Sequence, residues 1–371
     1  MKKYINAFVG SDSYPILIGC GVLEELSDYL ASAQCVAIVC DKYFESSLSS
    51  PIASTSILAD YPVFYLDGGI DAKGLVAVQA IVDWLFSLSF PRDGLLVAIG
   101  GGVIGDLVGF VASAYMRGVS LVHVPTTTTA MIDSSVGGKT GINYQNQVNL
   151  LGSYYNPVAT FMELAFLTSL DERDYKAGLC EALKMALTSD SRMVASFEAN
   201  STSIMSRDLQ DLAEVVYWSV STKLRHVSED LKEKSIRLLL NYGHTFGQSI
   251  ESFYGLSHSS LRHGEAVSLG MVVAASLSDQ LRSAKQPLRL SRSSLLQVTK
   301  SVLKSFGLPR ALCDLGLDQY PTPNELVEGL VNDKKRVASG SRFVVLNAVG
   351  DASVLTVTDP QLLLNSFKAI A

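Results

Sequence analysis

The feature that most constrains the fold is a change in the spacing of apolar residues part-way along the chain. Up to about Asn156, short β-rich apolar runs alternate with helical patterns. The β-rich runs are Cys35–Cys40, Val63–Leu66, Leu95–Ile99 and Leu121–Val124, and the helical patterns include Gly74–Leu88 and Asp106–Tyr115. Strands that alternate with helices are joined by right-handed crossovers, which predicts a parallel sheet covered on both faces.

Beyond this point the β-rich runs nearly vanish, and long segments with a period of 3.6 residues take over. These segments are Asp208–His226, Leu261–Arg282 and Ser291–Phe306, followed by two short β runs, Arg342–Leu346 and Ser353–Val357, around Gly350-Asp351. The sequence therefore predicts an α/β protein with a Rossmann-like parallel-sheet domain at residues 1–165. A mostly α-helical domain with one hairpin follows at residues 166–371.

Charge and cysteine content exclude several functional classes. The formal net charge is -6 and no block of Lys or Arg offers a surface for phosphates, so no nucleic-acid partner is expected. Five scattered cysteines without a CxxC pair argue against a cysteine-based zinc site and favour a reducing compartment. The apolar stretch Leu95–Met116 contains five glycines, which fits strand, loop and buried helix better than a membrane span. With no signal peptide visible, a cytoplasmic location is expected.

A glycine loop follows the third of the β-rich runs. Gly100, Gly102 and Gly105 match GxGxxG between a predicted strand and a predicted helix, where glycines let the backbone approach a pyrophosphate. The loop comes later in the chain than in a typical dinucleotide fold, so a close-packed turn between strand and helix is the alternative interpretation. Asp41, directly after the first of these runs, is the better candidate for binding the adenosine ribose.

The segment from Pro125 to Asn143 is too polar and too rich in glycine to be packing material. Its consecutive threonines supply hydroxyl groups, and Gly137-Gly138-Lys139 lets backbone N–H groups and one ammonium converge on an anion. A solvated surface loop is the alternative.

Three residues from separate segments are of the types that a catalytic zinc prefers as ligands. His244 and His263 lie among small residues, and Glu181 lies three residues before Lys184 on one face of a predicted helix. Two imidazoles and one carboxylate with an open fourth position are a usual catalytic zinc set. Spacing alone leaves open that these histidines are ordinary core or surface groups.

Together, a series of motifs resembles the 3-dehydroquinate synthase family of sugar-phosphate cyclases, over about Tyr14 to Gly350. In chain order they are GGGVIGD at Gly100–Asp106, MRGV at Met116–Val119, VPTTTTAMIDSSVGGKTGIN at Val124–Asn143, ELAFLTSL at Glu163–Leu170, GLCEALK at Gly178–Lys184, RLLLNYGHTFG at Arg237–Gly247, HGEAVSLGM at His263–Met271 and DKK at Asp333–Lys335.

The resemblance implies roles for individual residues. It implies zinc binding by Glu181, His244 and His263, with cobalt as an alternative metal. It implies NAD contacts for Lys73, Gly102, Val103, Ile104, Gly105, Asp106, Thr126, Thr127, Lys139, Phe166, Leu167, Thr168 and Ser169. It implies a substrate pocket of Asp133, Lys139, Asn149, Lys184, Lys223, Arg237, Asn241, Gln248 and Lys334 or Lys335. Arg117 matches an arginine that serves the active site of a partner subunit, so a homodimer is implied.

The implied reaction belongs to the shikimate pathway and acts on a small sugar phosphate, away from membranes. NAD oxidises a ring hydroxyl to a ketone, which acidifies the neighbouring C–H. Phosphate is then eliminated, the ketone is reduced again, and an aldol step closes the carbocycle. The metal polarises the oxygen that is oxidised. Five cationic side chains would bind the phosphate and carboxylate: Lys139, Lys184, Lys223, Arg237 and Lys334.

Three positions depart from the family pattern. Gln248 replaces a pocket histidine, Val148 replaces the lysine of a Lys-Asn pair, and Ile70 stands where an acid is expected before Lys73. These departures leave open a sibling cyclase of the 2-epi-5-epi-valiolone or 2-deoxy-scyllo-inosose type. Four residues that keep the dehydroquinate-type pattern argue against both siblings: Lys223, Arg237, Leu240 and Asn241. A polyol dehydrogenase of related fold and a non-catalytic paralogue that binds NAD or a sugar phosphate are further alternatives.

Overall fold

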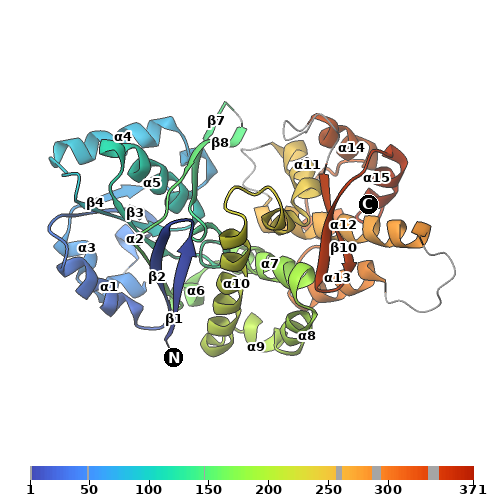
Figure 1. Ribbon diagram of the computed structural model, residues 1–371, viewed down its shortest axis with the longest axis horizontal. Helices are drawn as coiled ribbons and strands as arrows, with labels where there is room; N and C mark the ends of the chain where they lie inside the picture. Colours follow the sequence, from blue (N-terminus) through green and yellow to red (C-terminus); the bar gives the residue numbers. More distant parts are fainter. Residues whose placement is uncertain (1, 48–49, 146, 256–260, 286–293, 333–341) are drawn as a thin grey trace. The chain divides into compact units, whose positions relative to one another are not determined.

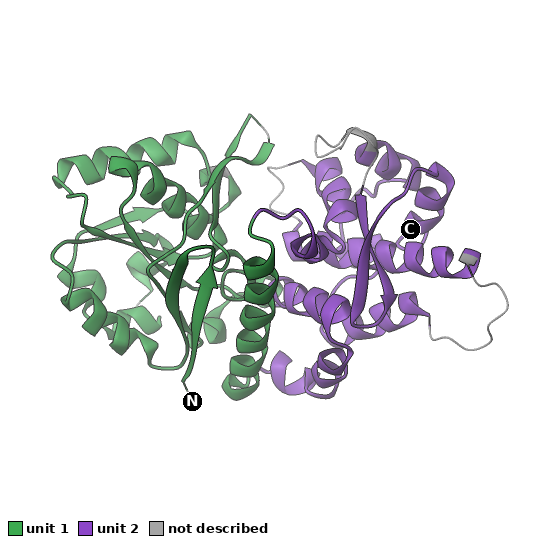
Figure 2. Cartoon of the chain, viewed as in Figure 1, with its two compact units in different colours: residues 1–175, 207–231 green, residues 176–206, 232–371 purple. Residues whose placement is uncertain are grey.

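The computed structural model describes residues 2–47, 50–145, 147–255, 261–285, 294–332 and 342–371. The chain forms two compact units (Figure 2). Unit 1 consists of residues 1–175 and 207–231, and unit 2 of residues 176–206 and 232–371. None of the described helices combines the length and the apolar character needed to span a membrane.

Unit 1 is built on a seven-stranded sheet (Figure 1). Its strands are β1 (Lys3–Val9), β2 (Asp12–Gly19), β3 (Val36–Asp41), β4 (Val63–Leu66), β5 (Leu95–Gly100), β6 (Ser120–Pro125) and β9 (Ala159–Glu163). They lie in the order β1-β2-β9-β6-β5-β3-β4. Only β1 and β2 pair antiparallel; the other neighbours are parallel. A separate antiparallel hairpin is made of β7 (Lys139–Tyr144) and β8 (Gln147–Tyr154).

The helices of unit 1 connect these strands. They are α1 (Val22–Ala31), α2 (Tyr43–Ser46), η1 (Pro51–Ser54), α3 (Ile57–Asp60), η2 (Ile70–Ala72), α4 (Leu75–Ser87), α5 (Gly102–Ala114), η3 (Tyr115–Arg117), η4 (Ala130–Ser134), α6 (Phe166–Ser169) and α10 (Leu209–Glu229). Leu85 of α4 and Leu107 of α5 are fully buried with Leu96 of β5 in one apolar cluster. Each such side chain contributes roughly 1.5–3 kcal/mol by leaving water, so α4 and α5 are fixed to this part of the sheet.

The strand order places a topological switch between β3 and β5. After β3 the chain adds β4 on one side, and then returns to place β5 on the other side of β3, followed by β6. In open parallel sheets, ligands bind outside the carboxyl ends of the strands at such a point. Asp41 ends β3 and Gly100 ends β5, so both predicted nucleotide-binding features lie at the switch.

The described residues of unit 2 form helices and one hairpin. Its elements are the greater part of α7 (Glu172–Ser189), then α8 (Ser191–Ala199), α9 (Ser201–Met205), η5 (Ile236–Asn241), α11 (His244–Tyr254), α12 (His263–Lys285), α13 (Leu295–Ser305), η6 (Leu312–Leu315), α14 (Pro323–Asn332), β10 (Arg342–Ala348), β11 (Asp351–Thr356) and α15 (Pro360–Phe367). Phe343 of β10 is buried and stacks on Phe246 of α11, with ring centroids 5.0 Å apart. The hairpin therefore contributes to the core of this unit.

The α/β fold class is confirmed, and so are the four strands expected before residue 125. The interpretation of Pro125–Asn143 as a loop throughout was wrong, because β7 begins at Lys139 and pairs with β8. The strand β9 also lies beyond Asn156, where β runs were expected to have nearly vanished. The predicted division at residue 165 followed the change of period, whereas α10 packs against β1 and β2 and belongs to unit 1.

Candidate metal centre and nucleotide site

Close backbone packing brings three segments of unit 2 together. A Cβ at Gly264, in the first turn of α12, would lie 1.9 Å from the carbonyl oxygen of Ala177 on α7. A Cβ at Gly270, two turns later, would lie 2.0 Å from the carbonyl oxygen of Gly243, which precedes α11. No side chain fits at such distances. Glycine at both positions therefore allows α7, α11 and α12 to approach closely.

The close packing of these helices brings the three predicted metal ligands together. Nε2 of His244 lies 3.4 Å from Nε2 of His263, and these two atoms lie 3.7 Å and 3.8 Å from Oε1 of Glu181. Among the described residues, Glu181, His244 and His263 form a group whose donor atoms can hold a metal ion. The donors come from α7, α11 and α12.

The donor set fits zinc in both chemistry and spacing. A tetrahedral zinc with bonds of about 2.1 Å separates its ligand atoms by about 3.4 Å, close to the spacings seen here. The other oxygen of Glu181, Oε2, accepts a hydrogen bond from the buried Lys184 ammonium. One carboxylate oxygen thus serves the lysine and the other faces the two imidazoles. Desolvation disfavours charge on His263, but Glu251 and Glu181 outweigh it and raise the pKa of this imidazole to about 9. A cation at this position would take the place of that proton.

Both imidazoles have acceptors near their second nitrogen. Nδ1 of His263 lies 2.9 Å from Oε1 of Glu251, and Nδ1 of His244 lies 3.4 Å from the carbonyl oxygen of Tyr242. Such partners place the proton on Nδ1 and leave Nε2 available to a metal. Glu251 lies two turns after His244 on α11, so one helix carries a ligand and the carboxylate that orients another ligand.

Replacement of Glu251 tests this orientation. Glu251→Gln should weaken zinc binding by roughly tenfold and Glu251→Ala by up to about a hundredfold, because an outer carboxylate fixes the ring and raises its basicity. Zinc affinity would be measured by competition with a chromophoric chelator. Glu328→Gln, an exposed carboxylate on α14, is the matched control and should leave the affinity unchanged. Equal affinities for all four proteins would contradict the assignment.

The remaining predicted residues of unit 2 lie around the same segments. Arg237, which is 2% exposed, and Asn241 both belong to η5. The amide of Asn241 donates to Oε1 of Glu233 at 2.5 Å. Gln248 lies one turn after His244 and is half-buried. The predicted substrate lysines Lys334 and Lys335 fall outside the described residues.

In unit 1 the glycine loop forms the turn between β5 and α5. Gly102, Val103 and Ile104 begin the 13-residue helix α5, where backbone N–H groups have no carbonyl one turn earlier to bind. The glycines also serve packing, because a Cβ at Gly102 would lie 2.8 Å from Oγ of Ser134 and one at Gly100 would lie 2.7 Å from Ile104. Both interpretations of the loop therefore find support. The helix start offers N–H groups to a phosphate, and the turn is close-packed.

Asp41 occupies the position expected of a ribose ligand. Its Oδ1 accepts a hydrogen bond from the backbone N–H of Tyr43 at 3.0 Å. A Cβ at Gly68 would lie 2.8 Å from its Oδ2, so glycine makes room for the carboxylate. Burial raises the pKa of Asp41. Its place at the switch point fits a carboxylate that binds ribose hydroxyls.

A charged network connects three predicted residues of unit 1. The ammonium of Lys73 lies 2.6 Å from Oδ2 of Asp106 and 2.5 Å from Oδ1 of Asn149. Asn143 joins the same segments, since its backbone N–H donates to the carbonyl of Lys73 and its side chain accepts from the backbone N–H of Asn149. Burial raises the pKa of Asp106, and Lys73 opposes that shift. The side chains of Ile70 and Val148, two of the departures from the family pattern, are 40% and 49% exposed beside this network.

A second ion pair in unit 1 joins Asp133 in η4 to Lys223 on α10. The nitrogen of Lys223 lies 2.7 Å from Oδ1 of Asp133 and also donates to the carbonyl of the same residue. Thr126 is buried, Thr127 caps the backbone N–H of Ala130 through its hydroxyl, and Lys139 is exposed at the start of β7.

The α6 segment divides into two kinds of residue. Phe166 and Leu167 are buried, and Phe166 packs edge-on against Phe44. Thr168 and Ser169 are exposed, with hydroxyls that donate to carbonyls of the preceding turn. Only the exposed pair therefore has side chains accessible to a ligand.

Three contributors to these sites were not predicted from the sequence. Glu251 orients His263, Glu233 holds Asn241, and Asn143 bridges the segments that carry Lys73 and Asn149. A spacing of seven residues from His244, which places Glu251 on the same helix face, was the only signal in the sequence. The other two depend on how the backbone folds: Glu233 lies eight residues before Asn241, and Asn143 contacts both Lys73 and Asn149.

Two family models match adjacent parts of the chain: 3-dehydroquinate synthase N-terminal at residues 63–177, and 3-dehydroquinate synthase C-terminal at residues 178–336. The 3-dehydroquinate synthase of Geobacter metallireducens is 34% identical over 358 residues, covering 95% of each chain. That of Acidithiobacillus ferrooxidans is 34% identical over 365 residues, covering 97% of this chain and 96% of the relative.

Solved structures agree in fold along the whole chain. A 2-deoxy-scyllo-inosose synthase complexed with carbaglucose-6-phosphate, NAD+ and Co2+ has a TM-score of 0.83 and 25% identity, covering 98% of this chain and 99% of the other. The 2-epi-5-epi-valiolone synthase of Streptomyces hygroscopicus, with NAD+ and Zn2+ bound, has a TM-score of 0.83 and 27% identity, covering 98% of both chains. An NADH-dependent butanol dehydrogenase from Thermotoga maritima shares the fold at a TM-score of 0.66 and 13% identity.

Proposed function

Since the chain belongs to the 3-dehydroquinate synthase family, we propose that it converts 3-deoxy-arabino-heptulosonate 7-phosphate to 3-dehydroquinate and phosphate. The observation that carries the proposal is the metal centre of unit 2, where three donors of the types that zinc prefers lie 3.4–3.8 Å apart beside a buried lysine. When bound, NAD would take a hydride from the substrate and return it, and zinc would polarise the oxygen at that carbon.

The chain's own residues would bind the cofactor and the substrate. In unit 1, Asp41 would hold the adenosine ribose and the start of α5 would hold the pyrophosphate. In unit 2, the three protein ligands leave a metal position open for a substrate oxygen. Lys184 and Arg237 are buried cations of this unit, and Lys223 is a buried cation of unit 1. They would supply positive charge for a phosphate and a carboxylate in a protein whose net charge is -6.

A panel of sugar phosphates tests the substrate. Purified protein with NAD and zinc would be offered 3-deoxy-arabino-heptulosonate 7-phosphate, glucose 6-phosphate and sedoheptulose 7-phosphate, and phosphate release would be followed. Only the first carries a carboxylate, so we expect release from that compound at least a hundredfold faster. Faster release from either of the others would identify a sibling cyclase instead. Release from none, with metal and NAD bound, would favour the non-catalytic paralogue.

Gln248 is expected to make this a slower cyclase than one with histidine there. It lies one turn after His244, and its amide can donate a hydrogen bond to a phosphate oxygen but cannot titrate near neutral pH. Gln248→His should raise the rate with 3-deoxy-arabino-heptulosonate 7-phosphate by roughly tenfold. The pH profile should gain a limb near the usual imidazole range of about 6–7. Loss of activity in this variant would count against the proposed substrate.

We propose further that the protein is a homodimer in which Arg117 serves the neighbouring subunit. Met116 and Arg117 both have left-handed backbones, with φ of 49° and 68°, although neither is glycine. Such strain at exposed residues points to a functional constraint. Tyr155, just after β8, packs beside Gly118, and β8 exposes the apolar side chains of Val148, Leu150 and Tyr154. An exposed apolar strand next to Arg117 is suited to a second copy of the chain.

Subunit complementation tests the role of Arg117. Arg117→Ala and Lys184→Ala homodimers should each be inactive. A random one-to-one mixture should recover up to about a quarter of wild-type activity, because about half of its dimers are heterodimers and one of the two sites in each heterodimer combines an intact Arg117 with an intact Lys184. Sedimentation would establish that dimers form. Heterodimers verified by two affinity tags that recover no activity would refute the assignment.

A further inference from the structure

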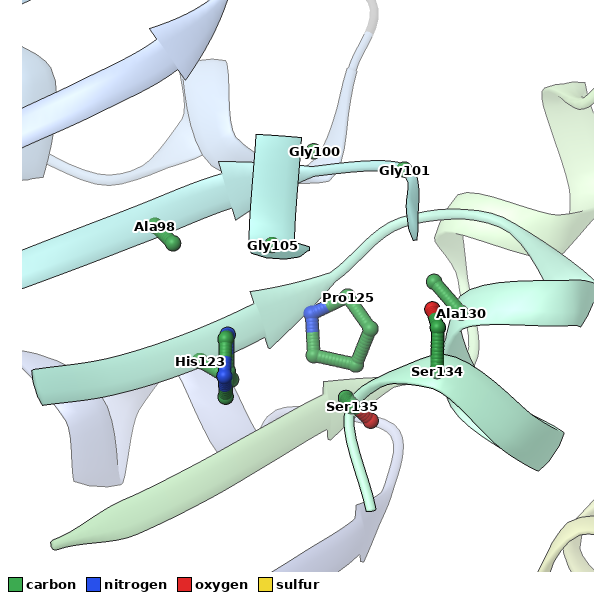
Figure 3. A pocket seen from close by; sticks show the side chains of 9 residues that line it. All are labelled: Ala98, Gly100, Gly101, Gly105, His123, Pro125, Ala130, Ser134 and Ser135. Carbon is green, nitrogen blue, oxygen red and sulfur yellow. The ribbon is translucent and has the colours of Figure 1, made fainter. Parts of the chain in front are cut away.

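A small cavity with polar and apolar lining lies beside the glycine turn of unit 1. Its volume is about 10 Å³, and its lining includes Gly101, Gly105, His123, Ser134 and Ser135 (Figure 3). These residues come from the turn after β5, from α5, from β6, and from η4 and the residue after it. The predicted mechanism uses neither His123 nor Ser135.

Within the part of the chain that the structure describes, one buried hydroxyl that lines the cavity lacks a hydrogen-bond partner, and so does a second one in the neighbouring strand. Oγ of Ser135 is buried and has no hydrogen-bond partner among the described residues, and neither has Oγ1 of Thr160, which is opposite His123 in the register of β6 and β9. A buried hydroxyl without a partner costs roughly 1–3 kcal/mol. Native structures therefore usually satisfy such groups with an ordered water.

His123 is suited to bind a neutral ligand. Its side chain is 6% exposed, and burial lowers its pKa to about 4. At neutral pH the imidazole is uncharged, with one nitrogen as donor and the other as acceptor. Its ring lies against α5, where a Cβ at Gly105 would be 3.5 Å from Cε1 and Nδ1.

We propose that this cavity is the site of one buried water molecule, held by Oγ of Ser135 and the imidazole of His123. A volume of about 10 Å³ is what a single water requires. It is too small for a phosphate or a nucleotide, and no lining residue is charged, which argues against an ion. The water would connect His123 of β6 to Ser135, which directly follows η4, the element that carries Asp133. His123 is thereby a positioning residue for the glycine turn, since its ring lies against Gly105, and for the end of η4.

A crystal structure of the wild-type protein at about 1.5 Å tests the site directly. It should show one ordered water within 3.2 Å of Oγ of Ser135 and of a ring nitrogen of His123, with and without NAD. A cavity that is empty, or a Ser135 hydroxyl bonded to the protein instead, would overturn the inference.

Two variants test the positioning role, which rests on the proposed NAD binding. His123→Gln retains groups that can bind the water, whereas His123→Phe keeps the ring volume without them. We expect the glutamine variant to bind NAD within about twofold of wild type, and the phenylalanine variant to bind about tenfold more weakly. Equal affinity of both variants would refute the role. If the phenylalanine variant does not fold, the positioning role is decided by the NAD affinity of the glutamine variant and by the crystal structure. Failure of the wild type to bind NAD would reject the proposed function but not the water site.

Discussion

Replacement of His263 with alanine is expected to abolish stoichiometric zinc binding and to lower turnover by at least about a thousandfold. His263 provides one of three donors spaced 3.4–3.8 Å apart. With two protein ligands left, the site would lose the geometry of a catalytic zinc. Metal content would be measured by elemental analysis after dialysis against zinc, alongside phosphate release.

The control is Gln248, a half-buried predicted pocket residue that lies one turn after His244 and is not a predicted ligand. Gln248→Ala should retain one zinc per chain. Retention of stoichiometric zinc by the His263→Ala protein would remove this residue from the ligand set. Zinc loss with unchanged turnover would separate the metal from the chemistry.

Replacement of Lys73 with methionine is expected to destabilise unit 1 by about 3 kcal/mol at pH 7, because it leaves the carboxylate of Asp106, whose side chain is only 19% exposed, without its cation. Lys73 is 6% exposed and lies 2.6 Å from that carboxylate. Burial already raises the pKa of Asp106, and loss of Lys73 would raise it further. A carboxyl whose pKa is higher in the folded than in the unfolded chain costs stability as pH rises above the unfolded value. The loss should therefore shrink as pH falls from 7 towards the ordinary carboxyl range of about 4, because more of the variant's Asp106 is then protonated.

Urea unfolding monitored by tryptophan fluorescence measures this effect, since both tryptophans of the chain, Trp84 and Trp218, lie in unit 1. Lys42→Met is the matched control. Lys42 lies 3.2 Å from Asp67, but both side chains are more than half exposed, so its loss should cost less than about 1 kcal/mol. Similar losses for the two variants, or a loss for Lys73→Met that does not depend on pH, would contradict the buried-pair account.

The sequence predicted well what depends on local pattern. Short apolar runs identified β3 to β6, and helical periodicity identified α4, α5, α10, α12 and α13. The antiparallel pair β7 and β8 was not predicted because most of its residues are polar or exposed, so no regular alternation of buried and exposed positions marks it. The assignment of α10 to unit 1 depends on packing against β1 and β2, which periodicity does not reveal.

The candidate site also combines features that the sequence predicted with features that depend on packing. Glu181, His244 and His263 were selected by residue type and by a family resemblance, and the structure brings their donor atoms together. The glycines that permit this, Gly264 and Gly270, were visible only as members of a motif. The structure shows their role, because a Cβ at Gly264 would lie 1.9 Å from the carbonyl oxygen of Ala177, and one at Gly270 would lie 2.0 Å from that of Gly243. Glu251 and Glu233 were not predicted, because their contacts with His263 and Asn241 depend on where the side chains lie in the folded protein.

The most direct test of the central claim follows phosphate and NADH together during turnover of 3-deoxy-arabino-heptulosonate 7-phosphate. The protein would be supplied with zinc and one equivalent of NAD per chain. Because the hydride is returned in each cycle, we expect many equivalents of phosphate and 3-dehydroquinate with no steady rise in NADH absorbance. Formation of one NADH per molecule of substrate consumed, with no release of phosphate, would identify a dehydrogenase and contradict the proposed function.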